Sequence, residues 1–253
     1  MKTSKIGWTD YSGGDLNFVI GCTPVSEACE NCYAAAWARR AGRDFGKVQL
    51  FPEKLERLLT ATFPTYSPKR GAEGNPMAFV VDLGDLFHPL VPADFIIQAF
   101  EIMGARSDVE WQVLTKRPER AADVLFGAEG GGYLGGGDYL PNVRMMVTVE
   151  NERHTDRINS LLDWWRGPNG VSVEPMLGPV NLTPWLWGKG DRLDWVICGG
   201  ESGPNHRQMD WLWANTLMLQ CRGSRVPFFG KQQSGRFPGE PLRFNGREIK
   251  QWP

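Results

Sequence analysis

Three of the five cysteines fall within eleven residues, and they are the residues in this sequence most suited to chemistry. Cys22, Cys29 and Cys32 have the spacing C-x6-C-x2-C, in a segment that also holds Thr, Pro, Ser, Glu and Asn. Thiolates are soft ligands that select zinc or iron–sulfur clusters. A structural zinc site has four protein ligands, whereas three thiolates on a [4Fe-4S] cluster leave one iron open to a small molecule. The motif therefore indicates a metal centre and favours an iron–sulfur cluster.

Two other interpretations of these cysteines stay open at this point. Free cysteine packs well in apolar surroundings, so the three could be core residues. A zinc site would need a fourth ligand, which His88, His154 or His206 could supply. A disulfide framework is excluded, because five cysteines are too few for one in a chain of 253 residues.

The elements that would position the cysteines follow from short apolar runs, each ending in polar residues or glycine. Runs without alternation and rich in β-branched residues are typical of strands buried on both faces of a parallel sheet. The predicted strands are 16–20, 78–81, 111–114, 143–147, 171–173, 195–198 and 226–229. The predicted helices are 29–41, 52–61, 92–105, 118–125, 152–165 and 210–222, three of which begin near a proline.

This alternation predicts an α/β fold, a full or partial (β/α) barrel of the TIM-like type, in a single domain over residues 1–253. The cysteine-bearing loop, 21–33, follows the first predicted strand. A second loop, 127–141, is rich in glycine, and we expect it to be a flexible surface loop. Because the carboxyl ends of parallel strands share one edge, ligands are expected to bind there.

The cysteine loop and several further segments resemble the phage three-cysteine-motif family, which looks like a branch of the radical S-adenosylmethionine (SAM) enzymes. The resemblance runs nearly end to end and is carried by DLFHP at 85–89, VLTKRPER at 113–120, VTVEN at 147–151, SVEPMLGPV at 172–180, WVICGGESGP at 195–204 and VPFFGKQ at 226–232. It implies that Cys22, Cys29 and Cys32 hold a [4Fe-4S] cluster and that SAM binds the fourth iron. One-electron reduction would cleave SAM to methionine and a 5′-deoxyadenosyl radical, which abstracts hydrogen from a substrate.

Two features depart from the pattern of these families. Most radical SAM enzymes have the spacing C-x3-C-x2-C, and the aromatic residue usually found before the last cysteine is replaced here by Asn31. The family lead-in resembling WTDATWNP reads WTDYSGGDLNF from Trp8, which is longer and lacks the second Trp and the Pro.

Polar residues and glycines at the predicted strand ends are the candidates for binding the cofactor and the substrate. Residues expected to face SAM are Asp82, Gly84, Asp85, Lys116, Arg117, Thr148, Glu150, Asn151, Gly199 and Gly200. Residues expected to take part in the reaction are Glu174, Glu201 and Lys231. Glu174 follows a buried run, where a carboxylate needs a partner or a function. The alternative for these residues is a structural role in turns, helix caps and surface ion pairs.

Composition limits the partners of the protein. A net charge of -1 argues against binding duplex DNA or an anionic membrane with the whole surface. No apolar window has the length of a membrane span, so we expect a cytoplasmic protein, in the host cytoplasm if phage-encoded.

The resemblance also implies a class of substrate and of partners. A phage context favours a nucleobase, nucleotide or DNA substrate, and a base in duplex DNA would have to leave the stack. A reductant protein and a further partner protein are implied as well. The competing hypothesis is a non-catalytic binding or regulatory module stabilised by zinc or an iron–sulfur centre, with a fourth ligand such as His88 or His206.

Overall fold

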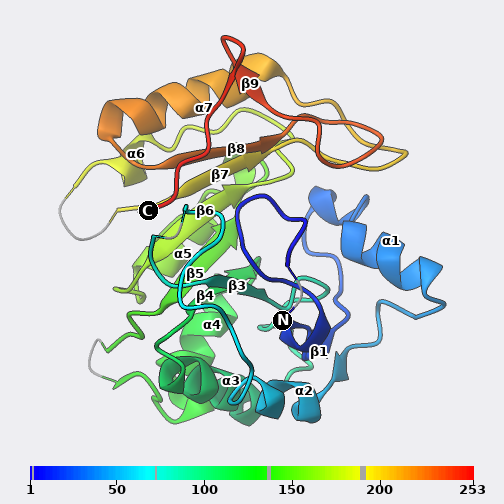
Figure 1. Cartoon of the computed structure of the whole chain (residues 1–253), viewed down its shortest axis with the longest axis vertical. Helices are drawn as coiled ribbons and strands as arrows, with labels where there is room; N and C mark the ends of the chain where they lie inside the picture. Colours follow the sequence, from blue (N-terminus) through cyan, green and yellow to red (C-terminus); the bar gives the residue numbers. More distant parts are fainter. Residues whose placement is uncertain (2, 72, 136–137, 189–191) are drawn as a thin grey trace.

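Six parallel strands form the central sheet in a computed structural model that describes residues 1, 3–71, 73–135, 138–188 and 192–253. The strands are hydrogen-bonded in sequence order, and each neighbouring pair is parallel. They are β3 (Met77–Val80), β4 (Glu110–Thr115), β5 (Val143–Thr148), β6 (Asn169–Val173), β7 (Val196–Gly199) and β8 (Phe228–Gln232). The sheet is a six-stranded parallel half-barrel (Figure 1). The predicted α/β fold with a partial (β/α) barrel is therefore confirmed.

The strands are apolar along their length because both faces of the sheet are covered. On one face of the sheet, the strand side chains pack against the helices and belong to the larger of two core clusters. On the other face, Phe79, Met146, Ile197 and Phe229 pack with Trp8 from the N-terminal segment. The rings of Trp8 and Phe79 are 4.8 Å apart. The start of the chain thus covers the inner face of the half-barrel.

The prediction that residues 16–20 form the first strand of the central sheet is wrong. The elements found there are a 3-10 turn, η1 (Gly14–Leu16), and a short strand, β1 (Val19–Ile20), which pairs antiparallel with β2 (Gln49–Leu50). Gly13 has a φ of 78°, a left-handed conformation that turns the chain out of an extended path. An isolated parallel bridge between Gly21 and Gly84 still connects this segment to the residues after β3.

The α-helices in the described residues agree in order with those predicted, apart from one short addition. They are α1 (Tyr33–Arg40), α2 (Pro52–Arg57), α3 (Ala93–Ala105), α4 (Pro118–Leu125), α5 (Asp156–Leu162), α6 (Thr183–Leu186) and α7 (Trp211–Ser224). The short helix α6 lies outside the predicted set. The prolines at the start of α2 and α4 occupy a first turn, where a missing N–H costs nothing.

Two predicted helices begin later than expected. The helix predicted over 29–41 starts only at Tyr33, because the preceding residues form the 3-10 turn η2 (Glu27–Cys29). The helix predicted over 152–165 is divided into the 3-10 turn η5 (Glu152–His154) and α5. The Asn151 side chain accepts a hydrogen bond from the backbone N–H of Arg153 at 3.0 Å, which stabilises the tight turn.

The glycine-rich loop, 127–141, is in part packed against the core. It contains the 3-10 turn η3 (Ala128–Gly130), and the Leu134 side chain is buried. Residues 136–137 of this loop lie outside the described residues. Its predicted flexibility stays a prediction.

Near its end the chain forms an antiparallel hairpin of β9 (Arg243–Phe244) and β10 (Arg247–Glu248). Within the described residues, none of the helices combines the length and the apolar character that a bilayer crossing needs.

Candidate functional site

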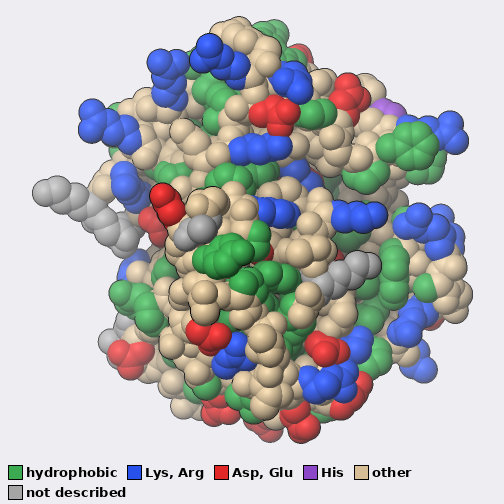
Figure 2. All heavy atoms as spheres, in the orientation of Figure 1, with side chains coloured by type: hydrophobic (Ala, Val, Ile, Leu, Met, Phe, Trp, Pro, Cys, Tyr) green, Lys and Arg blue, Asp and Glu red, His purple; other side chains and the backbone are tan. Residues whose placement is uncertain are grey.

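The three clustered cysteines lie on a loop, residues 21–33, which we call the cysteine loop. Cys22, Cys29 and Cys32 are free thiols with partly exposed side chains. Gly21 begins the loop with a φ of 110°, and a Cβ atom there would lie 2.8 Å from the backbone oxygen of Lys47. In the space-filling view, the edge at which the strands end is hollowed between α1 and the loops after β7 and β8, with Lys and Arg side chains on both sides (Figure 2).

The thiol of Cys22 contacts a buried ion pair at the ends of β3 and β4. Arg117 Nη1 donates to Cys22 Sγ at 3.3 Å and to Asp85 Oδ2 at 2.9 Å. Arg117 Nη2 donates to the carbonyl oxygen of Thr23 at 2.9 Å. The Arg117 and Asp85 side chains are 10% and 7% exposed. Burial raises the pKa of the Cys22 thiol, as does Asp85, and the Arg117 guanidinium opposes that shift.

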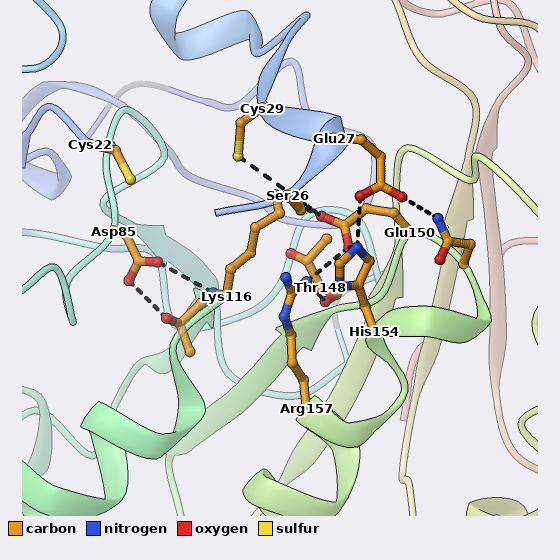
Figure 3. Close-up of polar contacts among 12 residues, drawn as sticks. Cys22, Ser26, Glu27, Cys29, Asp85, Lys116, Thr148, Glu150, His154 and Arg157 are labelled. Carbon is orange, nitrogen blue, oxygen red and sulfur yellow. Dashed lines mark hydrogen bonds and ion pairs between the residues drawn. The ribbon is translucent and has the colours of Figure 1, made fainter. Parts of the chain in front are cut away.

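Asp85 is oriented by its own turn and by the end of β4. Its Oδ1 accepts hydrogen bonds from the Thr115 hydroxyl at 2.8 Å and from the backbone N–H of Phe87 at 3.0 Å. Its Oδ2 accepts from the backbone N–H of Lys116 at 3.3 Å (Figure 3). The same oxygen also accepts the bond from Arg117. Three donors thus hold this carboxylate against the arginine.

A second buried carboxylate, Glu150, lies beyond the end of β5 and anchors the middle of the cysteine loop (Figure 3). Ser26 Oγ donates to its Oε1 at 2.6 Å, and Arg157 Nη1 donates to its Oε2 at 2.8 Å. Lys116 Nζ is 3.5 Å from Oε1, and His154 Nε2 is 3.9 Å from Oε2. The Glu150 side chain is 0% exposed, so its charge depends on these partners.

The thiol of Cys29 lies beside this anchor, with its Sγ 3.8 Å from Ser26 Oγ. Burial by itself would raise the pKa of the Cys29 thiol. Backbone hydrogen bonds from Val25 and Ser26, together with the Lys116 ammonium, outweigh burial and lower that pKa below its ordinary value. A lowered pKa favours the thiolate, which is the form that binds metals.

Glu27, within the cysteine loop, reaches the loop after β5. His154 Nε2 is 2.8 Å from Glu27 Oε2, and Arg153 Nη2 donates to Glu27 Oε1 at 2.7 Å. The Asn151 amide also donates to Oε1. The hydrogen bond with His154 is the largest of the effects that lower the pKa of Glu27 to about 2. These contacts hold the turn η2, which ends at Cys29.

The last part of the cysteine loop is attached to the end of β7 by Glu201. The Oε2 atom of this carboxylate accepts from Asn31 Nδ2 at 3.0 Å and from the backbone N–H of Arg207 at 2.7 Å. Arg207 Nη2 donates to Glu201 Oε1 at 2.6 Å, and its Nη1 donates to Glu30 at 3.2 Å. Asn31 directly precedes Cys32, so Glu201 determines the path of the chain into the third cysteine.

Glu174 and Lys231 form an ion pair across β7, from the ends of β6 and β8. Their side chains are 17% and 21% exposed, so the pair can be reached from solvent. A Cβ atom on Gly199 of β7 would lie 3.3 Å from Glu174 Cδ. A glycine at that position therefore makes room for the pair.

Asp82, after β3, is the remaining carboxylate at this edge among the predicted residues. Its side chain accepts a hydrogen bond from the Asn17 amide, and its carbonyl oxygen accepts one from the Tyr33 hydroxyl. Burial raises the pKa of the Asp82 carboxyl. Tyr33 follows Cys32, so this contact also connects the cysteine loop to the end of β3.

The structure brings the predicted polar residues to one edge and shows that several of them hold the cysteine loop. Asp85, Arg117, Glu150, Asn151 and Glu201 all bond to the loop or to residues that bond to it. Whether they also face SAM stays a prediction.

The remaining predicted residues contact mainly the backbone or lie beside the anchors. A Cβ atom on Gly84 would lie 3.0 Å from the carbonyl oxygen of Gly21, and one on Gly200 would lie 2.3 Å from the backbone nitrogen of Ser234. Thr148 is buried at the end of β5, and its carbonyl oxygen accepts from Arg157 at 2.8 Å. Their expected contacts with SAM likewise stay predictions.

Sequence reasoning missed the residues that attach the cysteine loop to the sheet. These residues are Ser26, Glu27, Asn31, Arg157 and Arg207. The available signal was an unusual density of polar residues between the cysteines. The partners of Ser26, Glu27 and Asn31 stand 124 to 170 positions further along the chain, and no local pattern connects them. Arg157 and Arg207 lie 7 and 6 positions after the carboxylates that they bind.

The histidines considered as zinc ligands have hydrogen-bond partners in the protein. His88 Nδ1 accepts from the backbone N–H of Leu90 at 3.1 Å, so the neutral ring carries its proton on Nε2, which is 2.9 Å from Thr23 Oγ1. His206 Nδ1 is 2.8 Å from the carbonyl oxygen of Gly203. Across the described parts of the chain, no three or more His, Cys, Asp and Glu side chains form a group that could hold a metal ion.

Comparisons with known proteins give a family match and one similar structure. A sequence profile of the family described as "Protein of unknown function (DUF5131)" matches residues 3–249. No curated protein matches the chain. A solved structure of spore photoproduct lyase complexed with dinucleoside spore photoproduct is similar at 12% sequence identity and a TM-score of 0.48. The match covers 89% of this chain and 64% of that one, so the chain spans less than two thirds of that protein's length.

Proposed function

We propose that this chain, which belongs to the DUF5131 family, is an enzyme that holds a [4Fe-4S] cluster on Cys22, Cys29 and Cys32 and binds SAM beside it. One observation carries the proposal. Three partly exposed thiols lie on one short loop, and ion pairs with buried carboxylates attach that loop to the carboxyl edge of a half-barrel. When bound there, the cluster supplies an open iron for SAM and the electron that cleaves SAM, so that hydrogen can be abstracted from a substrate.

The donor set fits such a cluster. Thiolates are the usual protein ligands of iron–sulfur clusters, and the cysteine loop offers three of them. The lowered pKa of Cys29 favours the thiolate. Arg117, Glu150 and Glu201 bond to residues throughout the loop and attach it to the sheet. Within the described residues the three thiols do not form a metal-holding group, so binding of the cluster would have to bring them together.

Glu174 and Lys231 are the charged pair that we assign to the substrate side of the site. Their ion pair is partly exposed at the edge that carries the cysteines. The ammonium can bind an anionic group of the substrate, and the carboxylate can accept a hydrogen bond or a proton. Gly199 of β7 lies between β6 and β8, and its lack of a side chain leaves room for the ion pair above it.

The substrate class that we propose is a nucleobase or nucleotide. Lys and Arg side chains flank the hollow at the strand ends, which suits a phosphate-bearing molecule (Figure 2). The proposal includes an electron-donor protein, because the cluster has to be reduced before SAM is cleaved. We also propose a further partner protein, and purification of the native complex tests for it.

The test is anaerobic reconstitution of the full chain, followed by iron and sulfide analysis and electron paramagnetic resonance of the reduced protein. The expected result is a four-iron signal that changes when SAM is added. Cys22→Ala, Cys29→Ala and Cys32→Ala should each lose this signal and SAM cleavage. Cys221→Ala is the matched control, because that buried thiol lies on α7 outside the loop, and it should keep both.

Two outcomes would contradict the proposal. Cleavage of SAM by a variant lacking all three loop cysteines would exclude the mechanism. Stoichiometric zinc, or a cluster whose signal is indifferent to SAM, would favour the non-catalytic metal-stabilised module instead.

A further inference from the structure

We infer that Arg117 is a positioning residue that fixes the sulfur of Cys22 and, by its charge, makes the bound cluster easier to reduce. This inference rests on the function proposed above. It concerns the contact between Arg117 and Cys22, which the protein forms without any bound cofactor. Among the described residues, Arg117 is the cationic side chain with a hydrogen bond to one of the loop thiols, at 3.3 Å.

The position of Arg117 is set by several contacts at once. Nη1 is shared between Cys22 Sγ and Asp85 Oδ2, and Nη2 donates to both the carbonyl oxygen of Thr23 and its hydroxyl, the latter at 3.3 Å. The backbone N–H of Arg117 donates to Thr115 Oγ1 at 2.9 Å. A planar guanidinium with these partners has little freedom to turn toward solvent.

The residue that follows Cys22 is held from a second direction. His88 Nε2 is 2.9 Å from Thr23 Oγ1, and the other ring nitrogen of His88 accepts the backbone N–H of Leu90. The hydroxyl of Thr23 therefore receives hydrogen bonds from both His88 and Arg117. Arg117 and His88 thus hold the Cys22–Thr23 segment from two directions.

These contacts distinguish the present assignment from the use of Arg117 to bind the carboxylate of SAM or a substrate phosphate. Both terminal nitrogens of Arg117 already donate to protein acceptors, and its side chain is 10% exposed. A ligand would have to displace Asp85 or Thr23 to reach them. The sulfur of Cys22 needs no such displacement.

The physical effect on a cluster has a definite sign. Reduction adds a negative charge, and hydrogen bonds and positive charge next to a ligand sulfur stabilise the reduced state. Asp85 offsets part of the arginine charge at the sulfur. Replacing Arg117 leaves Asp85 in place, so the change at the sulfur is the loss of a positive charge and of a hydrogen bond. Loss of the guanidinium should therefore make reduction harder.

The experiment compares midpoint potentials of the reconstituted full-length protein and of Arg117→Gln and Arg117→Lys, by spectroelectrochemical titration with a low-potential chemical reductant. A hydrogen bond to a charged group contributes enough for about a tenfold change in an equilibrium. Arg117→Gln should lower the reduced-to-oxidised ratio at a fixed potential about tenfold, which is 59 mV for one electron. Arg117→Lys keeps the charge, and it should shift the ratio less, in the same direction.

Arg207→Gln is the matched control. Arg207 also holds the cysteine loop, through Glu201, Glu30 and the carbonyl oxygen of Glu27, but it has no hydrogen bond to a thiol. We expect this variant to release iron to a chelator faster while its midpoint potential stays that of the unmodified protein. A purely structural role for Arg117 would give the same pattern for both arginines.

The outcomes separate the two proposals. An Arg117→Gln protein that takes up its cluster and has the unmodified potential overturns the inference and leaves the proposed function intact. An equal shift in Arg207→Gln overturns it too, because the effect would then belong to the loop as a whole. If Arg117→Gln does not fold or load, the uncharged variant Arg117→Met takes its place, and an unchanged potential in that variant overturns the inference. An unmodified chain that takes up no cluster overturns both proposals.

Discussion

The carboxylate of Glu150 should be a large contributor to the stability of the metal-free protein. Glu150→Gln keeps the size of the side chain and removes its charge, which leaves the Arg157 and Lys116 side chains, 11% and 23% exposed, without an anionic partner. Removing one partner of a buried ion pair costs about 3–5 kcal/mol. We expect a loss of this size in the free energy of unfolding.

The assay is urea unfolding of the metal-free protein, followed by circular dichroism and tryptophan fluorescence. Thermal unfolding gives a second measurement. In a chain of this size each kcal/mol of unfolding free energy shifts the melting temperature by about 2–4 °C, so Glu150→Gln should lower the melting temperature by about 6–20 °C. Glu56→Gln is the control, because Glu56 lies on α2 with an exposed side chain. A substitution on that surface should stay within about 0.5 kcal/mol.

A double-mutant cycle with Arg157→Leu tests the contact itself. If Arg157 Nη1 and Glu150 Oε2 interact at 2.8 Å, the double variant should lose about 1–3 kcal/mol less than the sum of the single losses. Additive losses would refute the contact. A loss below about 1 kcal/mol for Glu150→Gln alone would refute the argument that its buried charge stabilises the fold.

Two further predictions concern the cysteine loop. The lowered pKa of Glu27, about 2, means that the folded state binds fewer protons than the unfolded state between that value and the ordinary one of 4.5. The unfolding free energy should therefore fall as the pH drops through this range, and Glu27→Gln should show a smaller fall in acid titrations followed by circular dichroism. Gly21→Ala forces a side chain into a φ of 110° against the backbone of Lys47, and it should cost about 1–3 kcal/mol in urea unfolding and reduce the iron bound on reconstitution. An alanine variant with unchanged stability and iron content would contradict this reading of the turn.

Much of the fold could be predicted because its signals are local. The helix predicted over 118–125 has the observed bounds of α4, since Pro118 defines the first turn and the apolar residues recur at helical spacing. The buried strands were recognisable as unalternating apolar runs, because a parallel sheet is covered on both faces. A (β/α) barrel places consecutive strands side by side, and the six strands of the sheet have that order.

The errors arose where local geometry competes with the apolar pattern. The apolar character of Leu16 predicts a strand, yet this residue ends a 3-10 turn that begins after Gly13. The helix expected from Cys29 was delayed to Tyr33 by the turn η2, whose carboxylate, Glu27, bonds to residues after β5. A hydrophobic pattern contains no information on such distant hydrogen bonds.

The sequence by itself determined that three thiols lie on one short loop, because their spacing along the chain is independent of the fold. It also determined that charged residues would gather at one edge, since parallel strands end together. The tertiary structure alone decided what those charges do. Ser26 meets Glu150 across 124 positions, and Asn31 meets Glu201 across 170, so the partner of each group depends on how distant strands align. A buried charge needs a counter-charge close in space, which can be far away in the sequence. The sequence therefore marked Arg117 as a candidate site residue, and only the tertiary structure shows that it contacts Cys22.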